Sequence, residues 1–458
     1  MTDADDGTGV ATDVLAWLAS PGGRLVLAET ATVAATTDAV AAPAVLRRRH
    51  PDLDPRLVTA ALGQVDLRAR ATVRFGDDAA AMVFTRDGLE QATRRTVADH
   101  RAASLRARSG GDVRPGGDVR SGGDVRSGGD VRTVADLCCG LGGDLVALAR
   151  AGYAVTGVDR DPVAVAAARA NLAALGLAGS VRTADVTAID LGSFDAVVAD
   201  PARRSGRGRE TDPAAFSPDW DWVRTVLTAP GRRAVVTTTP ALPHRMVPAG
   251  CEAEWVGDGG EVVEAALWSG ALAANVRRRA TLLPGGLDST GRAPLTVTDV
   301  ELPAQAPPIR DPRPGDLLVE PHGAVARAGL VGVVADRLSG SLPASGIAYV
   351  LADEPSTAAL ASVDGLGTAF SVEEVLPMRD RPLRSRLAQL GVGRLEILKR
   401  GVDVRPEALR LRLIGARPAG TAPATLVLTR TATGAAALLV SRRPVPVPVR
   451  VPVRGREP

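Results

Sequence analysis

A glycine-rich loop near residue 140 restricts the possible folds of this chain more than any other segment. The loop reads Asp136-Leu-Cys-Cys-Gly-Leu-Gly-Gly-Asp144, begins in the apolar run Thr133–Leu137 and ends in the helix-like run Gly143–Ala151. Small residues between a strand and a helix allow a ligand to approach the backbone closely. The positive end of the helix behind the loop favours an anionic group such as a carboxylate. The loop therefore predicts a parallel sheet with a cofactor site at the carboxyl end of one strand.

Strand and helix signals alternate after the loop, which favours an α/β domain over residues 133–280. This alternation is typical of a parallel sheet with helices on both faces. Gly259-Gly260 precedes the strand-like run Glu261–Trp268, so the sheet is expected to end in an antiparallel hairpin. The other expected strands are 154–158, 180–183, 194–199 and 233–238, and the other expected helices are 162–175 and 222–227.

Segments of a different character flank this domain. Residues 1–108 have the apolar spacing of helices, and a turn at Asp87-Gly88 is expected to precede one long helix over 89–107. Residues 109–132 are four copies of a hexad such as Ser-Gly-Gly-Asp-Val-Arg, whose two glycines favour a flexible linker. The segments expected after the domain are a Pro- and Gly-rich linker at 281–312, a small mixed segment at 313–369, a basic module at 370–443 and a disordered Pro/Val/Arg tail at 444–458.

The charge of the chain is concentrated at one end. Residues 370–458 contain 17 Arg and Lys against 7 Asp and Glu, a net charge of +10. The whole chain carries +3, so residues 1–369 carry −7. Lys399 is the only lysine, so arginine takes the place of lysine throughout the chain. The abundance of arginine alone is therefore weak evidence for RNA binding. The uneven distribution says more, because a basic region beside an acidic remainder indicates a polyanionic partner.

Several classes of protein are disfavoured by what the sequence lacks. Three cysteines without a Cys-x-x-Cys pair do not make a disulfide framework. No apolar run approaches the roughly 20 residues that cross a bilayer, and the acidic N-terminus does not look like a signal peptide. We therefore expect a reduced, cytoplasmic, soluble protein without a metal or a membrane partner. The histidines do not have metal-ligand spacing; they are His50, His100, His244 and His322.

Five residues in and after the loop are candidates for binding a nucleoside that carries an amino-acid end. Gly140 and Gly142 leave room for the ligand, and Asp136 is placed to accept a hydrogen bond from an ammonium group. Asp159 ends the second strand, 17 residues after Gly142, where a carboxylate can accept from both ribose hydroxyls. Asp185 follows the third strand and is placed to meet an adenine amino group. The ordered set is more specific than any of its members.

Two positions of the loop bear on which cofactor it holds. A dinucleotide site would have a third glycine where this chain has Leu145, which weakens the NAD interpretation. Cys138 stands where the usual Gly-x-Gly-x-Gly pattern has its first glycine. Cysteine is small and commonly buried, so a packing role for Cys138 within the cofactor loop is favoured over a redox role.

The fourth strand ends in the motif Asp200-Pro201-Ala202-Arg203. Methyltransferases that modify planar amines carry Asp/Asn-Pro-Pro followed by an aromatic residue, or a close variant, at this place. Asp200 and the carbonyl of Pro201 can accept hydrogen bonds from an exocyclic amino group, while proline fixes φ and offers no competing donor. The aromatic residue is missing here, and Arg203 is expected to stack on a base in its place. Glu264, on the last strand, is expected to be structural.

These motifs together resemble a known family. The segment VADLCCGLGGDLVALARAGYAVTGVDRDPVAVAAARANLAALG, followed by ADVT and DPARR, resembles class I S-adenosylmethionine-dependent methyltransferases. It is similar to trimethylguanosine synthases, which also have a Cys-Gly-x-Gly-Gly loop, and LEQATRRTVADHRA resembles the helix that leads into such cores. RPLRSRLAQLGVGRLEILKRGVDVRPEALRLRLIG resembles the THUMP-like domain of bacterial methyltransferases.

The resemblance implies a fold and a cofactor. It implies a Rossmann-like class I sheet, an N-terminal helical domain, a C-terminal α+β THUMP-like domain at 370–443, and S-adenosylmethionine as cofactor. RNA m5U enzymes place a nucleophilic cysteine in a Ser-Cys-Asn-Pro turn where this chain has Thr237-Thr238-Thr239-Pro240. Threonine does not readily form the covalent adduct of that reaction. The sequence therefore favours N-methylation of a base amine in tRNA or rRNA by direct displacement.

Two alternatives stay open at the level of sequence. The first is a methyltransferase of a protein or small molecule whose basic module serves another purpose. The second is a non-catalytic RNA-binding protein whose methyltransferase fold has decayed, for which Cys138 is the one argument. The substrate, the methylated atom and the oligomeric state do not follow from the residues.

Overall fold

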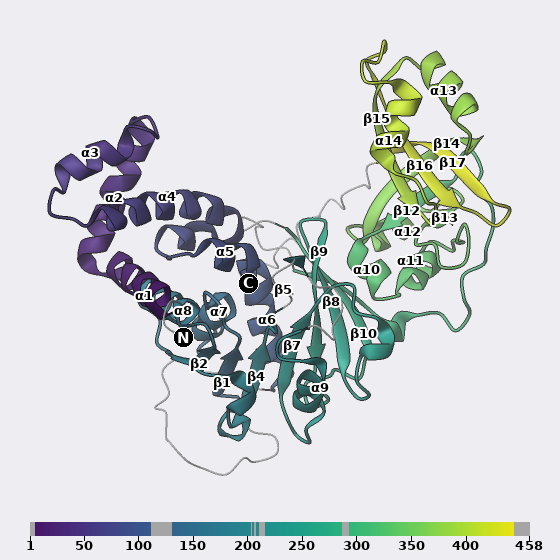
Figure 1. Ribbon diagram of the computed structural model, residues 1–458. Helices are drawn as coiled ribbons and strands as arrows, with labels where there is room; N and C mark the ends of the chain where they lie inside the picture. Colours follow the sequence, from purple (N-terminus) through teal and green to yellow (C-terminus); the bar gives the residue numbers. More distant parts are fainter. Residues whose placement is uncertain are drawn as a thin grey trace, which may run out of the picture. The chain divides into compact units, whose positions relative to one another are not determined.

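The computed structural model describes residues 5–110, 131–202, 204–205, 208–209, 216–285 and 293–443 (Figure 1). The chain forms two compact units, which are described separately below. The first comprises residues 1–259, 263–277 and 283–293, and the second comprises residues 260–262, 278–282 and 294–458. Most of the hexad linker expected at 109–132, and the tail expected at 444–458, lie outside the described residues. None of the described helices has the length and hydropathy of a membrane span.

The first unit is built on the expected parallel sheet. Its strands lie in the order β8-β9-β7-β4-β1-β2-β3, in which β1 pairs in parallel with β2 and β4, β2 with β3, and β4 with β7. β9 is antiparallel to β7, and Gly259-Gly260 connects β8 to β9, where the sequence predicted a hairpin. The strands are β1 (Thr133–Leu137), β2 (Ala154–Asp159), β3 (Ser180–Thr183), β4 (Ala196–Ala199), β7 (Ala234–Thr238), β8 (Glu252–Asp258) and β9 (Glu261–Trp268), and the helices between them are α7 (Gly143–Arg150), α8 (Pro162–Ala174) and α9 (Trp220–Thr228).

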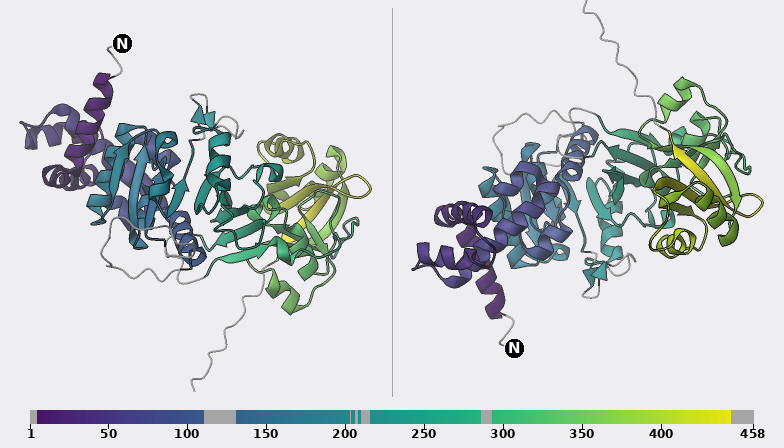
Figure 2. Two further views of the ribbon diagram at one scale, coloured as in Figure 1. Left: turned by 90° about the horizontal axis from the view of Figure 1, so that it is seen from below. Right: turned by 90° about the horizontal axis from the view of Figure 1, so that it is seen from above.

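The N-terminal helices pack against the α8 side of this sheet, where Figure 2 shows them grouped. Leu15 and Leu18 share a hydrophobic core with Ala167 of α8 and with Leu141 of the glycine-rich loop. The N-terminal region is therefore joined to the cofactor loop through its core. Its helices are α1 (Asp5–Ala19), α2 (Pro21–Thr36), α3 (Ala42–Arg49), α4 (Pro55–Phe75), α5 (Arg86–Gln91) and α6 (Arg95–Arg108).

The prediction of a turn at Asp87-Gly88 is wrong. Both residues lie inside α5, because the hydroxyl of Thr85 accepts a hydrogen bond from the Gly88 amide at 3.0 Å and caps the helix there. The single helix expected over 89–107 is instead interrupted after Gln91, and α6 begins at Arg95. The interruption leaves α5 as a separate short helix beside the glycine-rich loop. A Cβ at Gly88 would lie 2.7 Å from Leu141 Cγ, so this close approach requires glycine.

Helix α6 is attached to the β8–β9 hairpin by charged groups. Glu252, Glu254 and Asp258 share one face of β8, since alternate residues of a strand point the same way, and all three are buried. Removing one partner of such a buried pair costs about 3–5 kcal/mol. The contacts across this interface are Arg108 with Glu252 at 2.8 and 2.9 Å, His100 with Glu254 at 3.0 Å and Arg94 with Asp258 at 3.2 Å.

The second unit contains a sheet of strand order β13-β12-β14-β17-β16-β15. Its pairs are antiparallel except for β15 with β16, which are parallel. Leu383 and Leu409, from α13 and α14, pack with Leu426 and Leu428 of β16 in one core. The elements are β12 (Leu317–Pro321), α10 (Gly323–Arg327), α11 (Val331–Arg337), β13 (Val350–Ala352), α12 (Thr357–Ser362), β14 (Gly367–Pro377), α13 (Asp380–Gln389), β15 (Val392–Arg400), α14 (Pro406–Ile414), β16 (Ala422–Arg430) and β17 (Ala435–Arg442).

Two expected segments differ in the structure. The linker expected at 281–312 contains part of β10 (Arg278–Leu283) and all of β11 (Leu295–Thr298), which pair antiparallel. The mixed segment expected at 313–369 is part of the same sheet as the basic module, because β12 pairs with β14 across the limit placed at residue 370. In both segments, proline and glycine near the strands obscured the strand pattern in the sequence.

Candidate functional site

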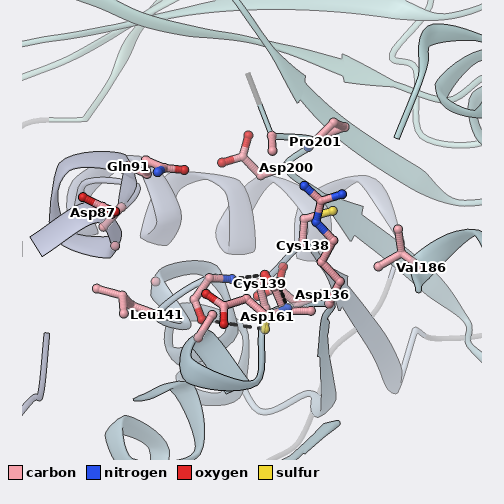
Figure 3. Close-up of a pocket in the computed structure, with 18 of the residues that line it drawn as sticks. Asp87, Gln91, Asp136, Cys138, Cys139, Leu141, Asp161, Val186, Asp200 and Pro201 are labelled. Carbon is pink, nitrogen blue, oxygen red and sulfur yellow. Dashed lines mark hydrogen bonds between the residues drawn. The ribbon is translucent and has the colours of Figure 1, made fainter. Parts of the chain in front are cut away.

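A cavity of about 570 Å³ opens at the carboxyl ends of β1, β2 and β4 (Figure 3). This volume is in the usual range for small-molecule sites. Carboxyl ends of strands at the point where the strand order reverses are where open parallel sheets bind ligands. The lining includes seven aspartates and two arginines, namely Asp87, Asp136, Asp144, Asp159, Asp161, Asp185, Asp200, Arg86 and Arg160.

The glycine-rich loop reaches this cavity through three residues in left-handed conformations. Cys138, Gly140 and Gly142 have φ of 59°, 52° and 83°. Cys138 and Gly140 line the cavity, whereas Gly142 does not. Gly142 begins α7, and a Cβ there would lie 3.3 Å from the Cβ of Ala168 on α8. The sequence predicted that Gly142 binds the cofactor. In the structure, close packing against Ala168 explains why a small residue stands at this position.

Cys138 carries a side chain at a φ that favours glycine. A non-glycine residue in this region costs roughly 1–2 kcal/mol. We expect Cys138→Gly to raise the free energy of unfolding of the first unit by about 1 kcal/mol, offset in part by the greater freedom of glycine in the unfolded chain. Urea unfolding followed by tryptophan fluorescence measures this, with Cys251→Ala as a cysteine control elsewhere. A clear loss of stability in Cys138→Gly would show that thiol packing outweighs the backbone strain.

The thiols in the loop are poorly suited to nucleophilic chemistry. Burial raises the pKa of Cys138 and of Cys139, and the nearby carboxylates Asp136 and Asp159 raise both further. The reactive form of cysteine is the thiolate, which a raised pKa disfavours. These cysteines therefore line the site as neutral groups.

Asp136 has a buried carboxylate oxygen without a partner. Its side chain is 2% exposed, lies at the end of β1 on the cavity wall, and its Oδ2 has no hydrogen bond within the described part of the chain. Burial raises the pKa of Asp136 well above its ordinary value, and Asp144 and Asp200 raise it further while Arg101 lowers it. An unpaired buried acceptor is costly unless a ligand donates to it. An ammonium group fits this oxygen.

Asp159 and Asp185 also lie where the sequence predicted. Asp159 ends β2 and accepts from the amides of Gly140 and Asp161, both at 3.0 Å, so it fixes the loop and still has lone pairs toward the cavity. Asp185 Oδ1 accepts from the Thr187 amide at 2.9 Å and the Thr187 hydroxyl at 2.7 Å. These bonds lower the pKa of Asp185, which favours its ionised form, and both are made to Oδ1 of an exposed side chain that lines the cavity.

Asp200 and Pro201 form the wall that follows β4. The Asp200 amide donates to Leu137 O at 3.1 Å, and the Thr237 hydroxyl donates to Asp200 Oδ1. The backbone of Asp200 is therefore fixed by β1, and its carboxylate is held by Thr237 of β7. Ala202 pairs with Ser217 on either side of the following loop. Arg203, the third residue of the predicted acceptor site, lies outside the described residues.

Several lining residues were not predicted from the sequence. Helix α5 supplies Asp87 and Gln91, which Figure 3 shows on the opposite side of the cavity from Asp200 and Pro201. Thr93 and Asp144 also line it, and Arg101 lies behind them. The resemblance of LEQATRRTVADHRA to a lead-in helix was the available signal, but it did not indicate which side chains reach the ligand. In the described parts of the chain no group of acidic, histidine and cysteine side chains has metal-site geometry.

Comparison with known proteins adds three family models and full-length relatives. Residues 134–203 match a family described as methyltransferase domain, residues 367–443 one described as THUMP domain-like, and residues 11–71 a domain of unknown function. An uncharacterized S-adenosylmethionine-dependent methyltransferase of Mycobacterium tuberculosis (strain H37Rv) is 34% identical over 400 residues, which cover 85% of this chain and 96% of the relative. The corresponding protein of strain CDC 1551 gives the same values.

A solved structure shares the architecture. It is a candidate methyltransferase from Porphyromonas gingivalis W83, with a TM-score of 0.64 and 22% identity, and the match covers 86% of this chain and 92% of that one. At this level of identity the likeness concerns the fold, and it extends over both units of the chain.

Proposed function

The chain belongs to the S-adenosylmethionine-dependent methyltransferases, and we propose that it methylates an exocyclic amine of a base in RNA, either tRNA or rRNA. The observation that carries this proposal is the position of Asp200 and Pro201 in the wall of the cavity that holds the cofactor motifs. Bound S-adenosylmethionine supplies a methyl group activated by the sulfonium sulfur. The residues of the chain then have to hold this donor, orient an acceptor and exclude competing groups.

The cavity suits this cofactor in chemical terms. The unpaired Oδ2 of Asp136 can accept from its ammonium group, Asp159 from its ribose hydroxyls and Asp185 from its adenine amino group. Cys138 and Gly140 bring the loop backbone to the wall between them. The excess of carboxylates also favours a ligand with a positive charge.

Asp200 and Pro201 suit an amine acceptor. A fixed carboxylate beside a proline carbonyl presents two acceptors and no donor, which matches a planar amino group. Hydrogen bonds from that amino group would hold its nitrogen toward the donor, so orientation supplies most of the catalysis. Covalent attack on a pyrimidine ring is disfavoured, because Thr237 donates its hydroxyl to Asp200 and the lining thiols are neutral.

The second unit supports RNA as the carrier of that amine. Its THUMP domain-like match and the net charge of +10 over residues 370–458 both favour a polyanion. Several exposed basic side chains have no ion-pair partner among the described residues, including Arg381, Arg394, Lys399, Arg405 and Arg417. The cavity itself is acidic and would repel phosphate, so a single unstacked base is the part of RNA that suits it.

Transfer of radiolabel tests the proposal directly. The protein is incubated with methyl-³H S-adenosylmethionine and total RNA from cells that lack it, and labelled nucleosides are identified by mass spectrometry. We expect label on a base amine in tRNA or rRNA, and RNA affinity that falls steeply with salt because phosphate contacts release counterions. Label on protein or small molecules alone, with salt-independent RNA binding, would favour the alternative methyltransferase. No label in any fraction, without cofactor binding, would favour the decayed fold.

A further inference from the structure

Arg101 is a fully buried cation behind the cavity wall. It lies on α6, is 2% exposed, and its guanidinium lies between two carboxylates from different elements. Nη1 donates to Asp144 Oδ1, and Nη2 donates to both oxygens of Glu264 on β9, at 2.6 and 2.7 Å. One side chain thus joins helix α6, the first turn of α7 and the antiparallel strand β9.

Asp144 connects this cation to the ligand side of the wall. It lies in the first turn of α7, lines the cavity, and accepts from the Thr93 hydroxyl at 3.2 Å. Thr93 lines the same cavity and precedes α6. Asp136, whose Oδ2 is unpaired, lines the same cavity, and the charges of Asp144 and Arg101 both act on its carboxyl group. The pair Arg101–Asp144 therefore borders the part of the site assigned to the amino-acid end of the cofactor.

We propose that Arg101 is a positioning residue for cofactor binding, which holds Asp144, and through it Thr93, in the wall of the cavity that Asp136 also lines. The proposal rests on the assignment of the cofactor's ammonium group to Asp136. Arg101 does not touch the cavity, so it acts through Asp144 and through its charge.

The charged groups around Asp136 explain why Arg101 affects the ionisation of this carboxyl group. The charged groups that act on it are Asp144 on α7, Arg101 on α6, Asp200 after β4 and Asp159 at the end of β2, with Glu264 behind Arg101. The thiols of Cys138 and Cys139 are also nearby. Arg101 is the one cation among those acting most strongly on Asp136. Without it, Asp136 holds its proton to a higher pH and loses the charge that an ammonium group needs. Glu264 has the opposite effect, because it neutralises part of Arg101.

Arg108 provides a matched control on the same helix. It lies two turns after Arg101, is also largely buried, and makes a bidentate ion pair with Glu252 on the neighbouring strand. Its guanidinium also lies 4.2 Å from the centre of the Trp268 ring. None of these groups lines the cavity. Arg108→Met therefore removes a comparable buried cation without changing the site.

Calorimetric titration of the full-length protein tests the proposal with two ligands. S-adenosylhomocysteine has the amino-acid end, and 5′-methylthioadenosine lacks it. For wild-type protein we expect the affinity for S-adenosylhomocysteine to rise with pH above the range in which an ordinary aspartate titrates, because Asp136, whose pKa is raised, must lose its proton to accept from the ammonium group. Arg101→Met should lower that affinity at neutral pH by about tenfold or more, the effect of one pKa unit, and leave the affinity for 5′-methylthioadenosine nearly unchanged.

The direction in which the midpoint of the affinity–pH profile moves distinguishes a positioning role of Arg101 from general damage to the structure. The midpoint of the affinity–pH profile should move upward in Arg101→Met and downward in Glu264→Gln, and Arg108→Met should leave it in place. Glu264→Gln also keeps the test decisive if Arg101→Met does not fold. Equal loss for both ligands, or a midpoint moved the same way by Arg101→Met and Glu264→Gln, would overturn the proposal.

The assignment of Asp136 is tested separately. Asp136→Asn should weaken binding of S-adenosylhomocysteine and remove its pH dependence. If Asp136→Asn has no effect, the ammonium assignment fails and the inference about Arg101 fails with it. If Asp136→Asn weakens binding while Arg101→Met does not, only the inference about Arg101 fails.

Discussion

Replacing Asp200 by alanine is expected to reduce methyl transfer to RNA by about 10²–10³-fold, the usual effect of removing one fixed polar group from a reacting centre. The Asp200 amide donates to the Leu137 carbonyl and the Thr237 hydroxyl donates to the Asp200 carboxylate, so both the backbone and the side chain are held before any acceptor arrives. The variant loses the acceptor that orients the amine, but it keeps the cofactor residues of β1 and β2. Single-turnover transfer of labelled methyl groups to RNA measures the rate, and calorimetry with S-adenosylhomocysteine should show affinity within about threefold of wild type.

Two further variants sharpen this result. Asp200→Asn keeps one acceptor oxygen and should retain more activity than Asp200→Ala. Thr237→Val removes the hydroxyl that fixes Asp200 and should have a smaller effect, of about tenfold, because the carboxylate remains. Full activity in Asp200→Ala would show that the acceptor is oriented elsewhere in the cavity, for example by Gln91 on α5. Loss of cofactor affinity in Asp200→Ala would instead indicate a binding role.

The parallel core followed from the sequence because its signals are local. β1 and β9 have the predicted limits, since apolar runs next to glycine or a turn mark both ends of these strands. Helix α8 begins as predicted at Pro162, because the Asp161 side chain accepts from the Val163 amide at 2.8 Å and caps the helix. Asp136, Asp159, Asp185 and Asp200 line one cavity for the same reason: each follows or ends a neighbouring parallel strand.

The parts that escaped prediction depend on contacts far apart in the chain. Arg101 pairs with Asp144 and Glu264 across 43 and 163 residues, and nothing in the local pattern of α6 marks which arginine is buried. Strands β10 and β11 exist because they pair with each other, although proline and glycine surround them. The start of α5 depends on the cap at Thr85, which a nearby Asp-Gly pair obscured. Sequence patterns predicted the aspartates at the strand ends that line the cavity, but not that helix α5 also lines it.

Replacing Asp159 by alanine is expected to lower the affinity for S-adenosylhomocysteine by about 100-fold or more. Two charge-assisted hydrogen bonds from ribose hydroxyls contribute roughly 1.5–3 kcal/mol each. The carboxylate also holds the loop, through the Gly140 amide at 3.0 Å, and the start of α8, through the Asp161 amide at 3.0 Å. Calorimetric titration gives the affinity, and the thermal unfolding midpoint with and without ligand gives an independent measure.

Asp159→Asn separates the two roles of this residue. The amide oxygen still accepts from the Gly140 amide, so this loop contact is retained, while the NH2 group that replaces Oδ1 accepts neither from the Asp161 amide nor from a ribose hydroxyl. Its loss of affinity should therefore be smaller than that of Asp159→Ala. A decayed, non-catalytic protein would bind S-adenosylhomocysteine weakly before any substitution, and neither variant would change that. Tight binding by wild-type protein that falls in the order wild type, Asp159→Asn, Asp159→Ala is compatible only with a functional cofactor site, in which the left-handed Cys138 is tolerated.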